Sequence, residues 1–344
     1  MGAAEREVAS ALGRAGLAAC ARPLVVMLSG GRDSVCLLDA LVLCNRRAPL
    51  HALHVNYGLR GIDCEEDERL CVELCGQRGV PIKVVHASAP PARGNLQAWA
   101  RELRYREALA LATALGSDAR VLTAHTLSDQ AETILYRLAA SPGRRALLGM
   151  RASEGALVRP LLSLSREQTT AYCRQRGLRW REDASNESER FARSRARQAL
   201  LPAFRSLHPA AERNLARSAA LLRAEAEVLE RLVADQLGGG EAIELARLRS
   251  LPGALARLVL IELAERATGR FVPQAGERLE ELIALGSERR SGAPARRQLH
   301  VGGGAAALIE GGVLRMVALE RRGRSAQVDC ALALGGTEDE QGSG

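Results

Sequence analysis

Hydrophobic positions in the first part of the chain form short runs that alternate with longer helical patterns. Residues 23–29 (PLVVMLS) predict a buried strand, and an apolar helix is expected to follow a glycine turn from about Ser34. Residues 50–58 (LHALHVNYG) predict a second strand, and the acid-rich residues 64–79 predict a helix that ends at Gly79. The chain therefore begins with alternating strands and helices.

The alternation continues beyond the second helix. Residues 80–87 predict a third strand, residues 96–116 a long amphipathic helix and residues 119–126 a further strand. Helices are then expected over residues 127–140 and 165–177. This order predicts an α/β fold with a parallel sheet, covered by helices and connected by right-handed crossovers.

A change of pattern near residue 210 predicts a domain boundary. Before it, residues 187–207 are rich in arginine and lack a clear period, whereas residues 208–240 form a long helical pattern that three glycines end. Helical patterns follow around Leu245 and Leu258, and residues 302–319 alternate as short strands do.

Three segments follow from these patterns. We expect an α/β domain over residues 1–210, a smaller and mainly helical domain over residues 211–325, and a disordered tail over residues 326–344. No internal repeat and no low-complexity array interrupts them.

The most informative loop is SGGRDS, which joins the first predicted strand to the first predicted helix. It comprises Ser29, Gly30, Gly31, Arg32, Asp33 and Ser34. Two glycines let backbone N–H groups line a concave anion site, the hydroxyls add donors, and the helix directs its positive end at phosphates. The spacing and lysine of a Walker A loop are absent. The loop therefore predicts an ATP site, although a simple turn with a helix cap uses similar residues.

Asp33 is an unusual residue for a phosphate loop because its charge repels phosphate. A cation between the carboxylate and the phosphates removes the conflict, so Asp33 is the candidate ligand of Mg²⁺. The competing interpretation is that Asp33 only caps the helix.

Composition adds a basic excess and leaves two interpretations open. The net charge is +8 and the pI is near 9.4, and Lys83 is the only lysine, so arginine supplies nearly all the positive charge. Arginine forks suit phosphate, which favours a nucleic-acid partner, whereas a GC-rich genome would also replace lysine by arginine. Three Phe, four Tyr and two Trp are too few for an extended aromatic platform for single-stranded RNA.

The eight cysteines are expected to be small core residues in a reducing cytoplasm. Cys36, Cys44, Cys71, Cys75 and Cys173 lie among apolar or helical neighbours, and no CxxC pair occurs. A metal site near Cys64, Cys71 and Cys75 is the less favoured alternative. The first residues resemble neither a signal peptide nor a membrane span, so we expect a cytoplasmic protein without a membrane partner.

SGGRDS resembles the PP-loop of the N-type ATP pyrophosphatases, and five further segments narrow the resemblance. They are HVNYGLRG (54–61), ARELRY (100–105), TAHTLSDQAETILYRL (123–138), RPLL (159–162) and GLRWREDASN (177–186). In this order they resemble the tRNA(Ile)-lysidine synthetase family over roughly residues 20–205.

The resemblance implies an ATP-dependent ligase that forms a carbon–nitrogen bond. Its substrates would be free L-lysine and the wobble cytidine of the isoleucine tRNA with a CAU anticodon. Adenylation of the cytosine carbonyl would release pyrophosphate, and displacement of AMP by lysine would make lysidine, changing the codon read from AUG to AUA.

The resemblance also implies roles for individual residues. Asp33, Arg104, His125 and Asp129 fall on catalytic positions, and Asp129, Glu132 and Arg197 on lysine-binding positions. Each also has a simpler interpretation, such as a surface ion pair of Arg104 with Glu107, acids that complement a helix dipole, or a phosphate contact for Arg197.

The chain departs from the family pattern at three positions. Tyr57 and Thr126 replace frequent histidines, and Ser194 replaces an asparagine between arginines.

An arginine-rich stretch is the expected tRNA contact. Residues 190–223 hold eight arginines against one acid, Glu212. The candidates for tRNA binding are Arg190, Arg193, Arg195 and Arg205. A solvated helix face is the alternative for such a charge run.

Two rival functions remain, a tRNA thiolase and a non-catalytic RNA-binding protein. The missing CxxC argues against the first, and the retained motif residues argue against the second. The oligomeric state is open, with a homodimer as one option.

Overall fold

The structure is a computed structural model that describes residues 2–45, 47–88, 90, 96–140, 143–182, 195–287 and 296–319. Arg190, Arg193, Ser194 and the predicted tail lie outside the described residues. The chain divides into two compact units, Met1–Arg223 and Ala224–Gly344. This division lies within a helix that begins at Ala211, close to the predicted boundary.

The first unit contains a six-stranded sheet in the order β3-β2-β1-β4-β6-β5. Its strands are β1 (Leu24–Met27), β2 (Leu50–Asn56), β3 (Ile82–His86), β4 (Arg120–Leu122), β5 (Ser153–Glu154) and β6 (Leu157–Val158). All neighbours pair in parallel except β5, which pairs antiparallel with β6 at the edge. The predicted α/β fold with a parallel sheet is therefore confirmed, with one short antiparallel strand added.

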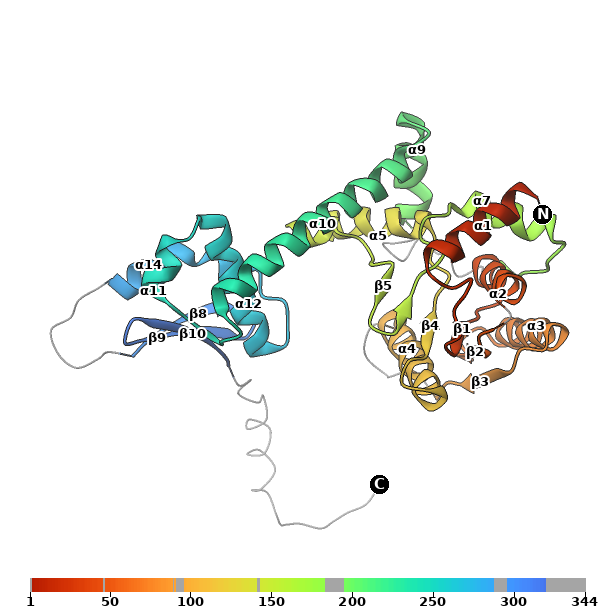
Figure 1. The fold of residues 1–344 in the computed structure, drawn as a ribbon, viewed down its shortest axis with the longest axis horizontal. Helices are drawn as coiled ribbons and strands as arrows, with labels where there is room; N and C mark the ends of the chain where they lie inside the picture. Colours follow the sequence, from red (N-terminus) through yellow and green to blue (C-terminus); the bar gives the residue numbers. More distant parts are fainter. Residues whose placement is uncertain are drawn as a thin grey trace, which may run out of the picture. The chain divides into compact units, whose positions relative to one another are not determined.

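Helices cover both faces of this sheet (Figure 1). They are α1 (Ala3–Arg14), α2 (Arg32–Cys44), α3 (Ile62–Arg78), α4 (Leu96–Leu115), α5 (Leu127–Ala140), α6 (Arg144–Leu147), α7 (Arg166–Gln175) and α9 (Leu201–Leu207), with a π-helical turn, η2 (Ala196–Leu200). Successive residues of β1 point to opposite faces of the sheet. Val26 packs in a core with α1, α2, α3 and α7, whereas Val25 packs in a core with α4.

Most of the cysteines in the described ranges are small core residues. Cys36, Cys64, Cys71, Cys75 and Cys173 are buried, whereas Cys44 is partly buried. Burial raises the pKa of the Cys71 thiol, which keeps it protonated and unreactive.

The second unit combines helices with an antiparallel sheet. Its elements are the later part of α10 (Ala211–Leu237), β7 (Ala242–Glu244), α11 (Leu245–Ser250), α12 (Gly253–Thr268), α13 (Gln274–Glu277), α14 (Leu279–Ser287), β8 (Arg297–Gly302), β9 (Ala305–Glu310) and β10 (Val313–Ala318). The strand order is β7-β10-β9-β8. Leu248, Val259 and Leu260 of the helices share a core with Leu314 of the sheet. The sheet includes the short strands predicted over residues 302–319.

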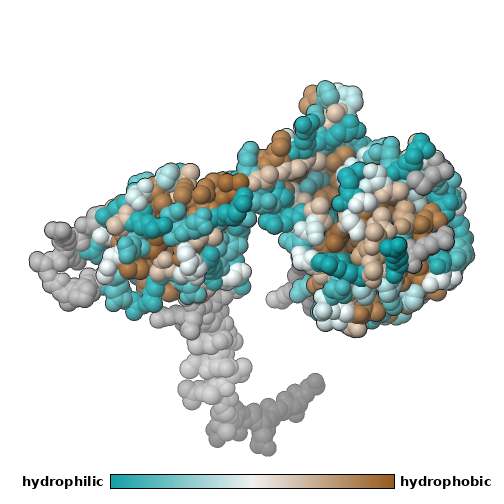
Figure 2. All heavy atoms as spheres, in the orientation of Figure 1, coloured by the Kyte–Doolittle hydropathy of each residue, from teal (hydrophilic) through white to brown (hydrophobic). Residues whose placement is uncertain are grey.

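On the face drawn in Figure 2, each unit shows both hydrophilic residues and hydrophobic patches. Within the ranges that the structure describes, no helix has the length and apolar character needed to cross a membrane.

Candidate functional site

The candidate site lies where the order of the sheet reverses. From β1 the chain runs outward through β2 and β3 on one side, and it returns to the other side of β1 with β4. The loops after β1 and β4 therefore leave the carboxyl ends of neighbouring parallel strands. Open α/β sheets bind ligands in the crevice at such a point. The predicted phosphate loop follows β1, and His125 and Asp129 follow β4.

The phosphate loop holds its shape through its serines. Ser34 Oγ donates to the Gly31 carbonyl at 2.8 Å and accepts from the Ser29 amide at 3.2 Å, and Gly31 N donates to Ser29 Oγ at 3.3 Å. Gly30 has a φ of +81°, the left-handed region that favours glycine. The loop leads directly into α2, whose N-terminal end favours a bound anion.

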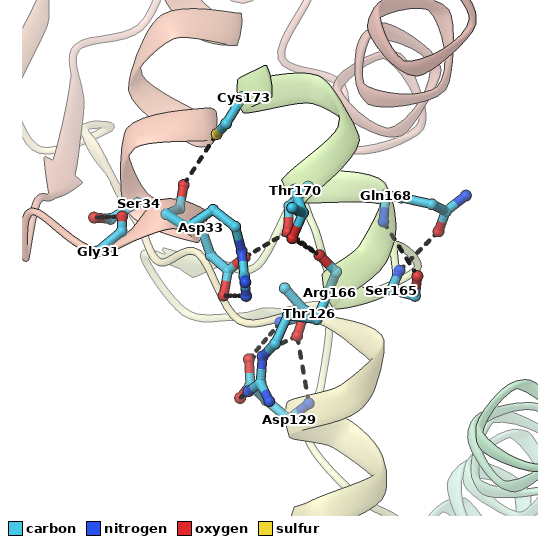
Figure 3. Close-up of polar contacts among 12 residues, drawn as sticks. Gly31, Asp33, Ser34, Thr126, Asp129, Ser165, Arg166, Gln168, Thr170 and Cys173 are labelled. Atoms are coloured by element: carbon cyan, nitrogen blue, oxygen red, sulfur yellow. Dashed lines mark hydrogen bonds and ion pairs between the residues drawn. The ribbon is translucent and has the colours of Figure 1, made fainter. Parts of the chain in front are cut away.

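Asp33 lies in the first turn of α2 and faces α7 (Figure 3). Its carboxylate accepts hydrogen bonds from Arg32 Nε at 3.1 Å and from Thr169 Oγ1 at 2.5 Å. The side chain keeps 21% of its surface exposed. Arg32, one of the predicted ATP ligands, is thus partnered with Asp33 and can neutralise phosphate beside it.

The residues present fit Mg²⁺ bound mainly through a nucleotide. Among the described residues, no three His, Cys, Asp or Glu side chains gather in a group able to hold a metal ion. Asp33 offers one partly exposed carboxylate next to the phosphate loop. Mg²⁺ commonly binds one or two carboxylates and takes its other ligands from phosphates and water, which matches this arrangement.

Asp129 lies in the first turn of α5 and forms a reciprocal cap with Thr126. Asp129 Oδ2 accepts from Thr126 N at 2.8 Å and from Thr126 Oγ1 at 2.9 Å, and Asp129 N donates back to Thr126 Oγ1 at 3.4 Å. Thr126, a departure from the family pattern, therefore fixes the carboxylate that follows it. The other oxygen, Oδ1, accepts from Arg166 of α7 at 3.1 Å (Figure 3).

Glu132 lies one turn further along α5 and is paired with two arginines. Arg197 Nε donates to Glu132 Oε1 at 2.7 Å and Arg197 Nη2 to Oε2 at 3.1 Å, forming a bidentate fork. Arg166 Nη2 donates to the same Oε1 at 3.3 Å. Glu132 is only 4% exposed, so these partners are needed to balance its charge.

The structure thus brings together the three residues predicted to bind lysine, Asp129, Glu132 and Arg197. Arg197 also interacts electrostatically with Asp33 of the phosphate loop. Burial lowers the pKa of the Arg197 guanidinium, but Glu132, Asp129 and Asp33 more than offset this, so the pKa is raised overall. Asp33 of the phosphate loop and the two acids of α5, Asp129 and Glu132, therefore all act on the same guanidinium.

His125 is held as a neutral side chain. Burial and the positive charges of Arg159, Arg101 and Arg104 together lower its pKa to about 4, against the opposing effect of Asp129. Thr123 Oγ1 lies 2.8 Å from its Nδ1. A neutral imidazole can donate one hydrogen bond to a phosphate oxygen, but it takes up a proton poorly at neutral pH.

Asp129 is kept charged by its surroundings. Burial raises the pKa of this carboxyl, but Arg166, His125 and the Thr126 amide outweigh burial, and the pKa is lowered overall. Asp129 is therefore a carboxylate at neutral pH.

Arg104 of α4 has a hydrogen-bonding group without a protein partner. Its Nε is buried and makes no hydrogen bond to any residue that the structure describes. Glu107, its expected surface partner, forms ion pairs with Lys83 and Arg106 instead. A buried donor atom without a hydrogen-bond partner, on a partly buried side chain, favours an anionic ligand over the simple surface interpretation.

The predicted tRNA-binding arginines are only partly described. Arg195 is exposed. Arg205 forms ion pairs with Glu212 at 2.6 Å and with Glu167 at 3.2 Å. Glu212, the one acid of the arginine-rich stretch, is 6% exposed and also accepts a hydrogen bond from Ser128 of α5. The charge of Arg205 is therefore largely balanced by acids of the protein itself.

Sequence reasoning missed Arg166 and Thr169, which join α7 to the site. The helix containing them was predicted, but not its approach to Asp33 and Asp129. A signal was present in SREQ, where Ser165 and Gln168 form a reciprocal cap and thereby place Arg166 in the first turn of α7.

Comparison with known proteins also indicates a PP-loop domain. The family model described as "PP-loop domain" matches residues 4–204. Among curated relatives, the tRNA(Ile)-lysidine synthase of Solibacter usitatus (strain Ellin6076) is 40% identical over 254 residues, covering 71% of this chain and 56% of the relative. A synthase of Thermus thermophilus is 37% identical over 297 residues, covering 85% of this chain and 56% of the relative. The chain thus spans about half the length of the curated relatives it matches.

A solved structure shares the fold. The U34-tRNA thiolase NcsA from Methanococcus maripaludis superimposes with a TM-score of 0.54 at 19% identity, covering 64% of this chain and 78% of the thiolase. The phosphate loop at the switch point, the shared fold and the family match over residues 4–204 show that the chain belongs to the PP-loop domain family.

Proposed function

We propose that the chain ligates lysine to the wobble cytidine of the CAU-anticodon isoleucine tRNA in an ATP-dependent reaction that forms lysidine. The observation that carries the proposal is the position of Arg197. It donates two hydrogen bonds to Glu132 and interacts electrostatically with Asp33. This arrangement supports an ATP loop and a binding site for a charged amino acid at one switch point. The curated relatives carry the name of this activity.

In the first step, the cytosine carbonyl oxygen attacks the α-phosphorus of ATP. A bond forms between this oxygen and the phosphorus, the bond from the phosphorus to the β-phosphate bridge breaks, and pyrophosphate leaves. The loop amides and the start of α2 hold the phosphates, and Arg104 can direct its free Nε at the charge that develops. His125, being neutral, orients a phosphate oxygen rather than removing a proton.

Mg²⁺ would supply charge neutralisation of the phosphates during this step. Asp33 is the residue that would hold it, with Thr169 fixing the carboxylate through its hydroxyl. Arg32 already lies beside Asp33 and shares the task of balancing phosphate charge.

In the second step, the ε-amine of lysine attacks the activated carbon of the base. The bond to the former carbonyl oxygen breaks, AMP leaves with that oxygen, and the amine loses a proton. Arg197 would pair with the carboxylate of lysine, and Asp129 and Glu132 with its ammonium groups. All four oxygens of these two acids accept hydrogen bonds in the structure, so lysine binding exchanges ion pairs rather than filling empty acceptors.

The tRNA would be held mainly through its phosphates. Arg195 is exposed, as such a contact requires, and we keep Arg190, Arg193 and Arg205 as further candidates. Because each neutralised phosphate releases counterions, tRNA affinity should fall steeply between low and moderate salt. Affinity that does not change with salt would contradict this part of the proposal.

The proposal is tested by following pyrophosphate release from ATP with and without tRNA and lysine. A lysidine-forming enzyme should release pyrophosphate when tRNA is present and AMP only when lysine is added as well. A non-catalytic RNA-binding protein should bind tRNA and release neither product. A thiolase should leave the tRNA unchanged with lysine and require a sulfur donor instead.

A further inference from the structure

The phosphate loop is held between two segments that are far apart in the sequence. On one side, Arg181 N donates to the Gly30 carbonyl at 3.0 Å, and Arg181 pairs with Gly31 in a short parallel bridge. On the other side lies α3, where a Cβ added at Gly30 would be 3.5 Å from the Asp67 carbonyl and 3.4 Å from Cys71 Sγ. Gly30 thus packs between the backbone of Arg181 and that of α3.

The side chain of Arg181 closes this arrangement by reaching across to α3. Its Nε donates to Asp67 Oδ1 at 2.7 Å, Nη1 to Glu66 Oε2 at 2.5 Å and Nη2 to Asp63 Oδ1 at 3.2 Å. Asp67 is 8% exposed, and its other oxygen accepts from Arg60 at 2.8 Å. One residue therefore ties the loop backbone to the first turns of α3.

The three acids have an electrostatic consequence for the loop beside them. Asp63, Glu66 and Asp67 place three negative charges on the helix that packs against a phosphate-binding turn. The negative charges of these acids repel the negative charges of a phosphate bound at the neighbouring loop. In the part of the chain that the structure describes, the guanidinium groups of Arg181 and Arg60 contact these acids, and only that of Arg181 contacts all three.

We propose that Arg181 is a positioning residue for the triphosphate of ATP. Its backbone fixes the carbonyl of Gly30, and its guanidinium cancels acidic charge that would otherwise repel the phosphates. The inference rests on the proposed use of ATP by this loop, and it goes further by assigning part of ATP affinity to a residue that touches no phosphate itself.

The test compares Arg181→Gln with Arg179→Gln. Arg179 lies two residues earlier, is largely exposed and pairs with Glu73, so it serves as a matched control. For R181Q we expect the KM for ATP, measured by pyrophosphate release with saturating tRNA, to rise about tenfold, because the acids of α3 lose the charge that cancels theirs. The kcat should stay within about twofold, because the reacting groups are intact. R179Q should match the wild type in both constants.

A charge-restoring variant separates positioning from simple loss of structure. Adding Asp63→Asn and Glu66→Gln to R181Q removes two of the repelling charges, so the KM for ATP should return most of the way to the wild-type value. Arg181→Lys, which keeps one charge, should give an intermediate KM. An unchanged KM in R181Q, or a triple variant no better than R181Q, would overturn the inference.

Two measurements keep the result interpretable. Direct calorimetric titration with ATP tests the affinity of each variant even if the wild type makes no lysidine, so failure of the proposed function and failure of this inference remain distinguishable. If R181Q does not fold, D63N/E66Q in the wild-type background should lower the KM for ATP, and a raised or unchanged KM there would overturn the inference.

Discussion

Arg197 donates two hydrogen bonds to Glu132, at 2.7 and 3.1 Å, although both residues were expected to contact lysine directly. The pair joins η2 to α5 and is only partly open to solvent, with Arg197 30% exposed and Glu132 5% exposed at the side chain. An ion pair of this kind can bind an incoming zwitterion by exchanging partners, because lysine brings one carboxylate and two ammonium groups.

The first prediction concerns Arg197. In Arg197→Ala the carboxylate of lysine loses its fork, so the KM for lysine should rise by roughly 10- to 100-fold, while tRNA affinity and pyrophosphate release persist. Separate titrations of lysine and tRNA check this. Arg195→Ala, at an exposed neighbouring position, should instead weaken tRNA binding and leave the KM for lysine unchanged. A reversed pattern would make Arg197 an RNA contact.

The two glycines of the phosphate loop should respond differently to alanine. Gly30 has a φ of +81°, a backbone conformation that side chains rarely adopt, so Gly30→Ala is strained and should lower adenylation at least tenfold. Gly31 has a φ of −73°, and the nearest atom to an added Cβ is Ser29 Oγ at 3.4 Å, so Gly31→Ala should keep most activity. Initial rates of pyrophosphate release compare the two, and equal losses would show that the loop geometry is not as described.

His125 should make stability depend on pH. Its pKa falls from an ordinary value of 6.5 in the unfolded chain to about 4 in the fold, so between these values the unfolded chain binds more protons. Stability should therefore be complete above about pH 6.5 and be lost as the pH falls toward 4, by at most about 3 kcal/mol. Urea unfolding of the wild type and of His125→Gln at several pH values isolates the contribution of His125 to the free energy of unfolding, because glutamine does not titrate. The same pH slope in both proteins would exclude His125 as its source.

Asp39 should be a main support of the fold beneath the site. It is 4% exposed and accepts hydrogen bonds from Arg78 at the end of α3 and from Tyr172 and Arg176 at the end of α7. Asp39→Asn leaves Arg78 without its acidic partner and Arg176 with only Glu5, at 3.7 Å, and should lower the free energy of unfolding by about 3–5 kcal/mol. Asp118→Asn, which removes only an exposed pair with Arg22 at 3.8 Å, should cost less than about 1 kcal/mol in the same denaturation experiment. Equal costs would contradict the role of Asp39.

Much of the fold was predictable because local signals agreed with the final packing. The helix predicted to end at Gly79 is α3, which ends at Arg78 with Gly79 in the left-handed conformation, and the helix predicted over residues 127–140 is α5. The strand β5 was missed because a two-residue antiparallel edge has no period of its own. The helix α1 was missed because its buried face rests on only Val8, Ala11 and Leu12.

The candidate site was predictable in its residues but not in its pairing. The motifs indicated Asp33, Asp129, Glu132 and Arg197, yet the contacts of Arg166 and Thr169 join segments more than thirty residues apart. Such contacts depend on the crossing of α2, α5 and α7, which no local pattern encodes. Similarly, Arg205 was expected to bind RNA from its charge alone, whereas its ion pair with Glu212 depends on tertiary packing.

The most direct test of the account is mass spectrometry of the isoleucine tRNA with a CAU anticodon after incubation with the protein, ATP, Mg²⁺ and lysine. The account predicts that the wobble cytidine gains the mass of one lysine minus one water, that no other nucleotide changes, and that the gain requires both ATP and lysine. An unchanged cytidine in tRNA that the protein demonstrably binds would contradict it, as would a mass gain that appears without ATP.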